Sequence, residues 1–267
     1  MVVDMFSEKR SQMQHWMWQR RFERKYGAQA GLMGDGRKVH LLFGLAGGGA
    51  DHLVRLLSRP GQRVRIYNAL LGKFTPALVF SQKGDPLAFP YQRDLERSHP
   101  MFRIYRLLVE GNSEWVTKGM SNRLPEAEIK DTPCLIKDTR ALLSAEALLE
   151  GLKARMMLFV GDPVKNVDRL FDQHGIEVPY LQGEARSVLS AQFLARFMRR
   201  DYDGVLECAK AIRQITDKRE RTIKLRVLTV ALIQHMFRRL ALRYPKQVVL
   251  AEYEQLEQNP RVLMEML

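Results

Sequence analysis

A short apolar run that passes into a glycine-rich turn and then into a helical pattern is the feature that most limits the fold of this chain. The run is Lys38–Phe43, and the glycine-rich segment Gly44–Asp51 follows it directly. His52–Ser58 then places its leucines on one face of a helix. A buried strand, a glycine loop and a helix, in this order, are what a phosphate-binding loop needs.

The rest of the chain alternates short apolar runs with helical patterns. We expect further strands at Val64–Tyr67, Ala77–Ser81, Cys134–Ile136, Met156–Val160 and Val248–Leu250. We expect helices within 92–110, 141–152 and 184–243, with breaks at Gly183 and Gly204, and others that begin just after Pro163 and at Pro260. This alternation predicts an α/β fold with a mostly parallel central sheet flanked by helices. We expect one such domain over residues 37–267, after a basic amphipathic helix and linker in residues 1–36.

The glycine loop has the spacing of a P-loop but lacks its usual side chains. Gly44 and Gly49 stand five residues apart, as in the G-x-x-x-x-G frame. Such glycines let backbone N–H groups approach a phosphate, and the helix start adds a positive dipole end. Ala50 and Asp51 occupy the positions of the usual Lys and Ser or Thr. The turn therefore predicts either a phosphate site made of backbone groups or a turn required only for tight packing.

Three more segments combine a predicted strand end with polar residues. Ile136–Thr139 places Lys137 and Asp138 at the end of one strand. Gly161–Val167, which reads Gly-Asp-Pro-Val-Lys-Asn-Val, follows the next strand. The last predicted strand ends in Tyr253–Pro260, which contains Tyr-Glu-x-Leu and a proline. Asp-Pro after a strand is common turn chemistry, whereas the Tyr-Glu-x-Leu segment is more specific.

Taken in this order, the four segments resemble the sulfotransferases that use 3′-phosphoadenosine 5′-phosphosulfate. In that family a P-loop-like turn binds the 5′-phosphosulfate, and Phe43–Asp51 is similar to it. Gly161–Arg169 resembles the Arg-Asp-Pro-Arg segment and helix that hold the 3′-phosphate. The resemblance implies a P-loop fold, this nucleotide as donor substrate without a metal, and an acceptor hydroxyl on a carbohydrate or small metabolite.

The loop departs from the family pattern. Aligned on Gly49, the family's cation and hydroxyl positions hold Gly47, Gly48, Ala50 and Asp51. A carboxylate about 5 Å from a phosphosulfate would cost on the order of 3 kcal/mol at an effective dielectric of about 20. Asp51 would alternatively cap the helix that follows. Because those side chains are missing, the backbone N–H groups of the loop would be the hydrogen-bond donors to the phosphosulfate.

The segment that resembles the 3′-phosphate site is altered as well. Gly161 replaces the arginine of the family, and Arg169 replaces its downstream serine. Lys165 and Arg169 are four residues apart, so they share a helix face and could supply positive charge to the nucleotide. The alternative is a solvated basic helix face.

Sulfuryl transfer is an in-line displacement that needs a cation on the bridging oxygen and a base for the acceptor hydroxyl. Lys137 is the candidate cation, because it matches the strand-end lysine of the family. His52 and Asp138 are the candidate bases. Asp138 could instead be only the ion-pair partner of Lys137.

The charge balance predicts attraction to anions. The chain has 43 Lys and Arg against 30 Asp and Glu, a net charge of +13. This excess suits a phosphorylated nucleotide and an acidic glycan as acceptor, and we do not expect nucleic acid as the partner. The basic helix in residues 5–25 either packs on the domain or contacts a membrane surface or another polyanion. The sequence makes no prediction of oligomeric state.

The cysteines and the lengths of the apolar runs indicate the cellular compartment of the protein. Cys134 and Cys208 both lie in apolar segments, which predicts two buried free thiols. No Cys and His cluster has metal-ligand spacing. The longest apolar stretch, Val227–Ile233, is well below the roughly 18–20 residues that span a bilayer. We expect a cytoplasmic protein that is membrane-peripheral if its N-terminal helix binds lipid.

Three functions remain open from the sequence. The first is an active sulfotransferase with a degenerate donor site, and the second is a non-catalytic relative that binds a polyanion or a protein. The third is another P-loop kinase or NTPase, which the missing lysine and the lack of an acidic strand end for Mg²⁺ disfavour.

Overall fold

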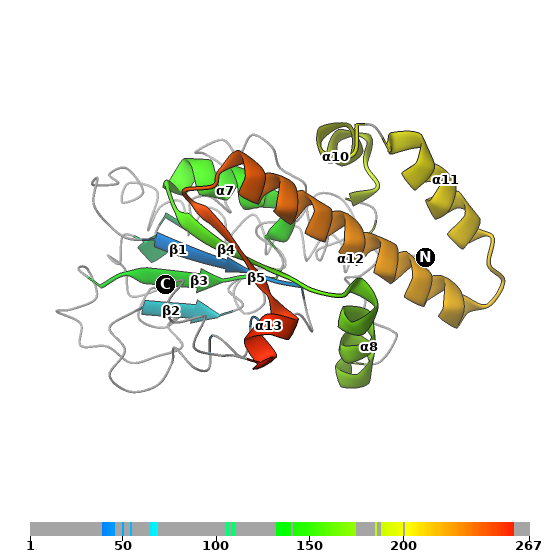
Figure 1. Cartoon of the computed structure of the whole chain (residues 1–267), viewed down its shortest axis with the longest axis horizontal. Helices are drawn as coiled ribbons and strands as arrows, with labels where there is room; N and C mark the ends of the chain where they lie inside the picture. Colours follow the sequence, from blue (N-terminus) through cyan, green and yellow to red (C-terminus); the bar gives the residue numbers. More distant parts are fainter. Residues whose placement is uncertain are drawn as a thin grey trace, which may run out of the picture.

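The structure is a computed structural model that describes residues 39–45, 50, 54, 65–68, 105–106, 108–109, 132–139, 141–174, 185, 188–199 and 201–258. Its centre is a five-stranded sheet in which all strands are parallel, in the order β2-β3-β1-β4-β5 (Figure 1). The strands are β1 (Val39–Phe43), β2 (Arg65–Asn68), β3 (Cys134–Lys137), β4 (Arg155–Val160) and β5 (Val248–Glu252). The α/β fold with a parallel central sheet, as predicted from the sequence, is therefore confirmed.

The helices whose bounds the structure describes follow β3, β4 and β5. They are the 3₁₀ turn η3 (Leu142–Ser144), α7 (Ala145–Leu152), α8 (Pro163–His174), α10 (Ala191–Phe197), α11 (Tyr202–Arg213), α12 (Lys218–Arg243) and α13 (Tyr253–Gln258). Ala50 and Val54 are also helical, as are residues 105–106 and 108–109. None of the helices in the described part of the chain is long and apolar enough to cross a membrane.

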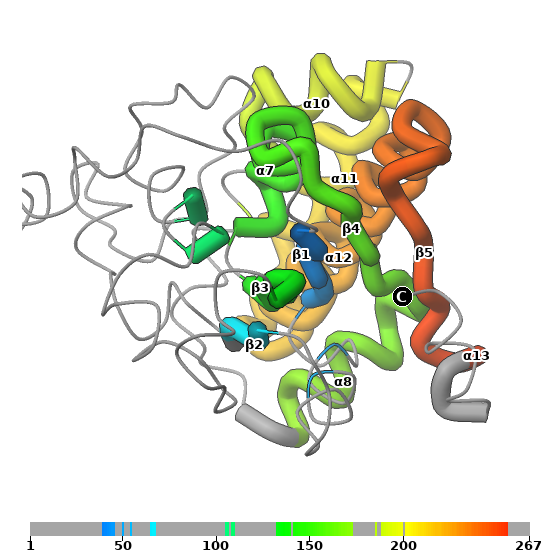
Figure 2. The backbone as a smooth tube through the Cα atoms, turned by 90° about the vertical axis from the view of Figure 1, so that its left-hand side faces the viewer, coloured from blue at the N-terminus to red at the C-terminus, as the bar shows by residue number. Residues whose placement is uncertain are grey.

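Both faces of the sheet are buried, as expected for parallel strands. Along β1, Leu41 and Phe43 face the larger core, whereas Leu42 faces a smaller one. The larger core includes side chains of α7, α10 and α12, and the smaller core includes Ala50 and Val54. Figure 2 looks nearly along β1, β2 and β3 and shows α7 lying over β1. Helices therefore cover both faces of the sheet.

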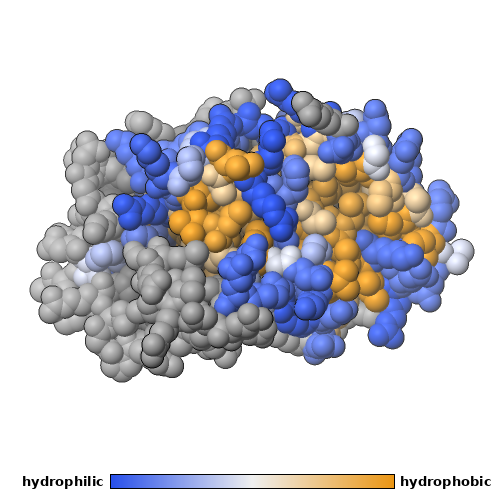
Figure 3. Space-filling view, viewed as in Figure 1, coloured by the Kyte–Doolittle hydropathy of each residue, from blue (hydrophilic) through white to orange (hydrophobic). Residues whose placement is uncertain are grey.

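Helix α12 is the long central helix of the larger core. Val230, Ile233 and Phe237 are fully buried on it. Figure 3 shows apolar side chains gathered over the region of α11 and α12. Ile223 and Val227 of α12 are partly buried and pack against the larger core. The middle of the helix, residues 225–237, is therefore enclosed on all sides, whereas its two ends carry exposed charged residues.

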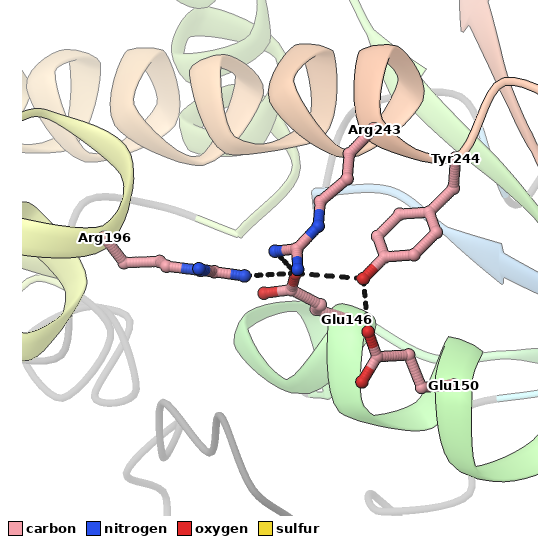
Figure 4. A network of polar contacts seen from close by, with 5 residues as sticks. All are labelled: Glu146, Glu150, Arg196, Arg243 and Tyr244. Atoms are coloured by element: carbon pink, nitrogen blue, oxygen red, sulfur yellow. Dashed lines mark hydrogen bonds and ion pairs between the residues drawn. The ribbon is translucent and has the colours of Figure 1, made fainter.

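A buried carboxylate joins three of these helices (Figure 4). Oε1 of Glu146 on α7 accepts hydrogen bonds from Arg196 of α10 at 2.7 Å and from Arg243 of α12 at 2.5 Å. The Tyr244 hydroxyl group lies 3.2 Å from the same oxygen and also donates to Glu150. The glutamate side chain is only 7% exposed. The network ties α7 to the end of α12 and to α10.

The start of α8 differs slightly from the prediction. The helix begins at Pro163 itself rather than after it. Asp162 precedes it, and its Oδ1 accepts hydrogen bonds from the backbone N–H groups of Val164 at 2.7 Å and Lys165 at 3.2 Å. A proline suits the first helical position because its missing N–H would be unpaired there in any case. The Gly-Asp-Pro segment is therefore a helix cap.

Three predictions about local structure were wrong. Gly204 does not break the helical region but lies inside α11, where Val205 and Ala209 are buried and hold the helix to the core. Cys208 is exposed, because it lies beside the buried face of α11 and not on it. Tyr253 begins α13 instead of ending the last strand. Both cysteines are free, as predicted, and Cys134 is buried.

Several predictions lie outside the described residues. They concern the N-terminal segment 1–36, the strand Ala77–Ser81, the break at Gly183 and the helix at Pro260.

Candidate functional site

The parallel sheet brings the four motif segments to one edge. Gly44 follows β1, Lys137 ends β3, Gly161 follows β4 and Tyr253 follows β5. These four strands are neighbours in the order β3-β1-β4-β5, and the carboxyl ends of parallel strands lie at the same edge. Segments that are far apart in the sequence therefore meet along this edge (Figure 1).

The chain leaves β1 and β4 toward opposite faces of the sheet. After β1 it enters the helical segment with Ala50 and Val54, which belongs to the smaller core, and it continues to β2. After β4 it continues through α8 and α12, whose buried side chains belong to the larger core, to β5. Because β1 and β4 are adjacent, this is a topological switch point, the place where open α/β sheets bind ligands.

The turn after β1 is tightly packed where it leaves the strand. A Cβ atom on Gly44 would lie 3.0 Å from the Cβ atom of Ala50 and 3.2 Å from that of Phe159. Few Cβ atoms approach so closely, so a side chain at position 44 would push Ala50 or Phe159 aside by a few tenths of an ångström. Gly47, Gly48 and Gly49 lie outside the described residues. So do Asp51 and His52, and the structure does not place the candidate helix cap or the first candidate base.

A small hollow lies at the switch point. Its apolar wall consists of Leu45 after β1 and of Phe159 and Val160 from β4. Its polar wall consists of Asn166 and Arg169 from α8 and Gln234 from α12. Gly161 and Tyr253 complete the lining.

The polar wall of the hollow is largely buried and incompletely hydrogen-bonded. Asn166 and Gln234 are each 2% exposed. Oδ1 of Asn166, Nε of Arg169 and Oε1 of Gln234 have no hydrogen-bond partner among the described residues. Most buried polar atoms in proteins are paired, so three unpaired ones among the residues that line a single hollow are unusual.

Of the two predicted cations on α8, the structure brings only Arg169 into the hollow. Its guanidinium carbon lies 4.1 Å from the centre of the Tyr253 ring, which is a cation–π contact. Lys165 is exposed, and it is absent from the lining of the hollow. The positive charge at this site therefore comes from Arg169.

A carboxylate lies where the resemblance predicts an arginine side chain. A Cβ atom on Gly161 would be 3.0 Å from Oε2 and 3.2 Å from Oε1 of Glu254. Oε1 of Glu254 also accepts a hydrogen bond of 3.2 Å from the backbone N–H of Asp162. Glu254 thus brings a negative charge beside the hollow, and an arginine at position 161 would require it to move.

Lys137 and Asp138 are both buried but belong to different faces of the sheet. Lys137 is paired in register with Leu42 of β1, two residues before the glycine turn. Consecutive strand residues point to opposite faces, so Lys137 shares the face of Leu135 in the smaller core. Asp138 lies on the other face, and its Oδ2 accepts a hydrogen bond of 3.1 Å from the Tyr105 hydroxyl group. The lysine therefore lies near the turn, whereas the second candidate base is held inside the larger core.

Burial dominates the electrostatics around Asp138. It raises the pKa of the Tyr105 hydroxyl group well above its usual value, and the negative charge and hydrogen bond of Asp138 raise it further. The phenol therefore remains a donor to the carboxylate throughout the neutral range. This is the chemistry of a structural pair, and Asp138 lines no part of the hollow.

Three residues of the site were not predicted. Asn166 and Glu254 lie inside the motif segments but received no role, and Gln234 lies in the apolar pattern of α12. A polar residue within the apolar run of a long helix was the pattern that could have indicated Gln234. Among the residues that the structure describes, no group of three or more His, Cys, Asp or Glu could hold a metal ion.

Comparisons with known proteins add no family. No protein-family model, no curated protein and no solved structure matches this chain. The resemblance to the sulfotransferases therefore depends on the four motif segments alone.

Proposed function

We propose that the crevice between the carboxyl ends of β1 and β4 binds a phosphorylated nucleotide, and that the chain transfers a sulfuryl group from 3′-phosphoadenosine 5′-phosphosulfate to a hydroxyl acceptor on a carbohydrate or small metabolite. The observation that carries the proposal is the hollow at the switch point, with the buried Arg169 Nε atom in its wall. Ligands of open α/β sheets bind at such a place.

Each part of the proposed chemistry has a candidate group near the crevice. The turn that begins at Gly44 would supply backbone N–H donors to the 5′-phosphosulfate, in line with the anion preference of a helix start. Arg169 would add positive charge from α8. Lys137, at the end of the neighbouring strand β3, would stabilise the bridging oxygen as it gains charge.

A second candidate function is anion or partner binding without catalysis. The Glu254 carboxylate beside Gly161 favours it, because a negative charge there opposes a phosphate at that position. The loop also lacks the hydroxyl side chains that the resemblance predicts, since Ala50 and Asp51 occupy those positions.

Calorimetry with adenosine 3′,5′-bisphosphate tests the proposal. We expect the wild-type protein to bind it and Arg169→Met to bind about tenfold or more weakly, because a charged donor is lost. Lys210→Met, an exposed lysine on α11, is the matched control and should bind normally. Absence of any heat or thermal shift at saturating ligand would refute nucleotide binding.

A transfer assay separates the two candidate functions. With 3′-phosphoadenosine 5′-³⁵S-phosphosulfate and a panel of sugars and phenols, an active enzyme should label at least one acceptor. Lys137→Met should lower that rate at least about a hundredfold while leaving bisphosphate affinity within about threefold. Binding without label transfer to any acceptor would favour the non-catalytic function.

A further inference from the structure

The polar wall of the hollow implies a particular ligand chemistry. Asn166, Arg169 and Gln234 converge there from two helices, and each has a buried polar atom without a partner among the described residues. Such atoms destabilise a fold, so an apolar residue of similar shape would serve packing better. Their presence together at a topological switch point indicates that they pair with a ligand.

The hydrogen-bonding capacity of these groups is mixed. Nε of Arg169 can only donate, whereas each carboxamide carries an acceptor oxygen and an amino donor and can turn either toward the hollow. With one of the two carboxamides turned so that its amino group faces the hollow, a hydroxyl group matches this set, because it donates one hydrogen bond and accepts two. It would accept from Arg169 and from one carboxamide, and it would donate to the oxygen of the other.

The charges around the hollow also favour an uncharged group. Arg169 is positive, Asn166 and Gln234 are neutral, and the Glu254 carboxylate lies against Gly161 in the lining. A phosphate in the hollow would be attracted by the arginine but repelled by the glutamate. A hydroxyl group meets no such opposition.

We infer that Asn166, Arg169 and Gln234 form a subsite for a hydroxyl group of the ligand, whose anionic part the proposed function assigns to the carboxyl end of β1 at Gly44. The inference rests on the proposed function, since it divides the same crevice into an anionic part and an uncharged part. The hydroxyl could come from the ribose of the nucleotide or from the acceptor alcohol, and the same three contacts would recognise either source.

Gln234→Met is the variant that tests the subsite, because it keeps the length of the side chain and removes its polar atoms. Gln192→Met, an exposed glutamine on α10, is the matched control. The probes are adenosine 5′-monophosphate, its 2′,3′-dideoxy analogue, inorganic pyrophosphate and methyl glucoside, each measured by calorimetry. The melting temperature of each free variant is measured as well.

We expect Gln234→Met to bind adenosine 5′-monophosphate about fivefold to tenfold more weakly, the effect of one lost hydrogen bond. Its affinity for pyrophosphate and for the dideoxy analogue should stay within about twofold of wild type. If the acceptor supplies the hydroxyl, methyl glucoside shows the loss instead. The free variant should melt at the same temperature as wild type or higher, because an unpaired buried group has been removed. Gln192→Met should match wild type throughout.

Several outcomes would overturn the subsite. One is equal weakening of pyrophosphate and adenosine 5′-monophosphate, which would indicate an anion in the hollow. Another is unchanged affinity for every probe, and a third is a crystal structure in which one ordered water fills the hollow in each complex. If Gln234→Met does not fold, Asn166→Leu provides the same comparison from α8.

Failure of the proposed function gives a different result. In that case neither pyrophosphate nor the nucleotide binds the wild-type protein, and the binding of methyl glucoside is the only test of the subsite. If methyl glucoside binds the wild-type protein and binds Gln234→Met more weakly, the subsite is supported. If methyl glucoside does not bind the wild-type protein, the subsite is refuted.

Discussion

The hydroxyl group of Tyr105 lies 3.1 Å from Oδ2 of Asp138, and both side chains are fully buried in the larger core. The contact joins a helical segment to the carboxyl end of β3. Tyr105→Phe should lower the free energy of unfolding by about 1.5–3 kcal/mol, because a buried carboxylate loses a donor. Urea denaturation measures this, with Tyr202→Phe, a partly exposed tyrosine of α11, as the control. A cost below about 0.5 kcal/mol would show that the hydrogen bond contributes little.

Arg65 is a second buried group whose removal should destabilise the protein. Its guanidinium group is fully buried and donates to the carbonyl oxygens of Thr132 at 3.0 Å, Leu108 at 2.7 Å and Val109 at 2.8 Å. Arg65→Met should cost at least about 3 kcal/mol, because three buried acceptors lose their donors together. Arg65→Lys should recover only part of this loss, since an ammonium lacks the planar fork that reaches all three oxygens. Full recovery by lysine in urea denaturation would mean that charge alone matters.

The Glu146 network predicts a large difference between two glutamates. Glu146→Gln should lower the free energy of unfolding by about 2–4 kcal/mol, because Arg196 and Arg243 lose a buried carboxylate. Glu220→Gln removes one partner of the exposed pair with Lys224, which should change stability by less than about 0.5 kcal/mol. Guanidinium denaturation of both variants tests this contrast. Equal effects would indicate that the three-helix contact is solvated and weak.

Two glycines should respond in opposite directions to alanine. Gly44→Ala should cost about 1–3 kcal/mol, because the new Cβ atom would meet Ala50 at 3.0 Å and Phe159 at 3.2 Å. Gly204→Ala should stabilise the protein by about 0.5–1 kcal/mol, since it lies inside α11 with nothing within 4 Å of the added atom. Thermal denaturation compares the two. A neutral Gly44→Ala with unchanged bisphosphate affinity would argue against a tight turn at the proposed nucleotide site.

The two cysteines should differ in reactivity. Burial raises the pKa of the Cys134 thiol to about 12, whereas Cys208 is exposed on α11. The reactive form is the thiolate, and at pH 8 about one Cys134 in ten thousand would carry it. Ellman's reagent should therefore label one thiol rapidly, and the second only after unfolding. Cys208→Ser should remove the rapid phase, and two rapid phases in wild type would contradict the burial of Cys134.

The positions of the five described strands could be predicted because runs such as Met156–Val160 are apolar on both faces. Local details were less predictable. Gly204 and Cys208 were misjudged, since a residue's effect on a helix depends on which face packs against the core. The candidate site was predicted in part: Gly44, Lys137 and Arg169 lie at the expected edge, and Asp138 points into the core instead.

By itself the sequence determined where strands end and which polar residues follow them, because hydrophobic periodicity and glycine placement are local properties. The tertiary structure decided which strand ends are neighbours, and therefore that Gln234 of α12 meets Asn166 and Arg169 of α8. It also decided that Glu254 lies beside Gly161. Such contacts depend on packing between distant segments, and no short stretch of sequence carries that information.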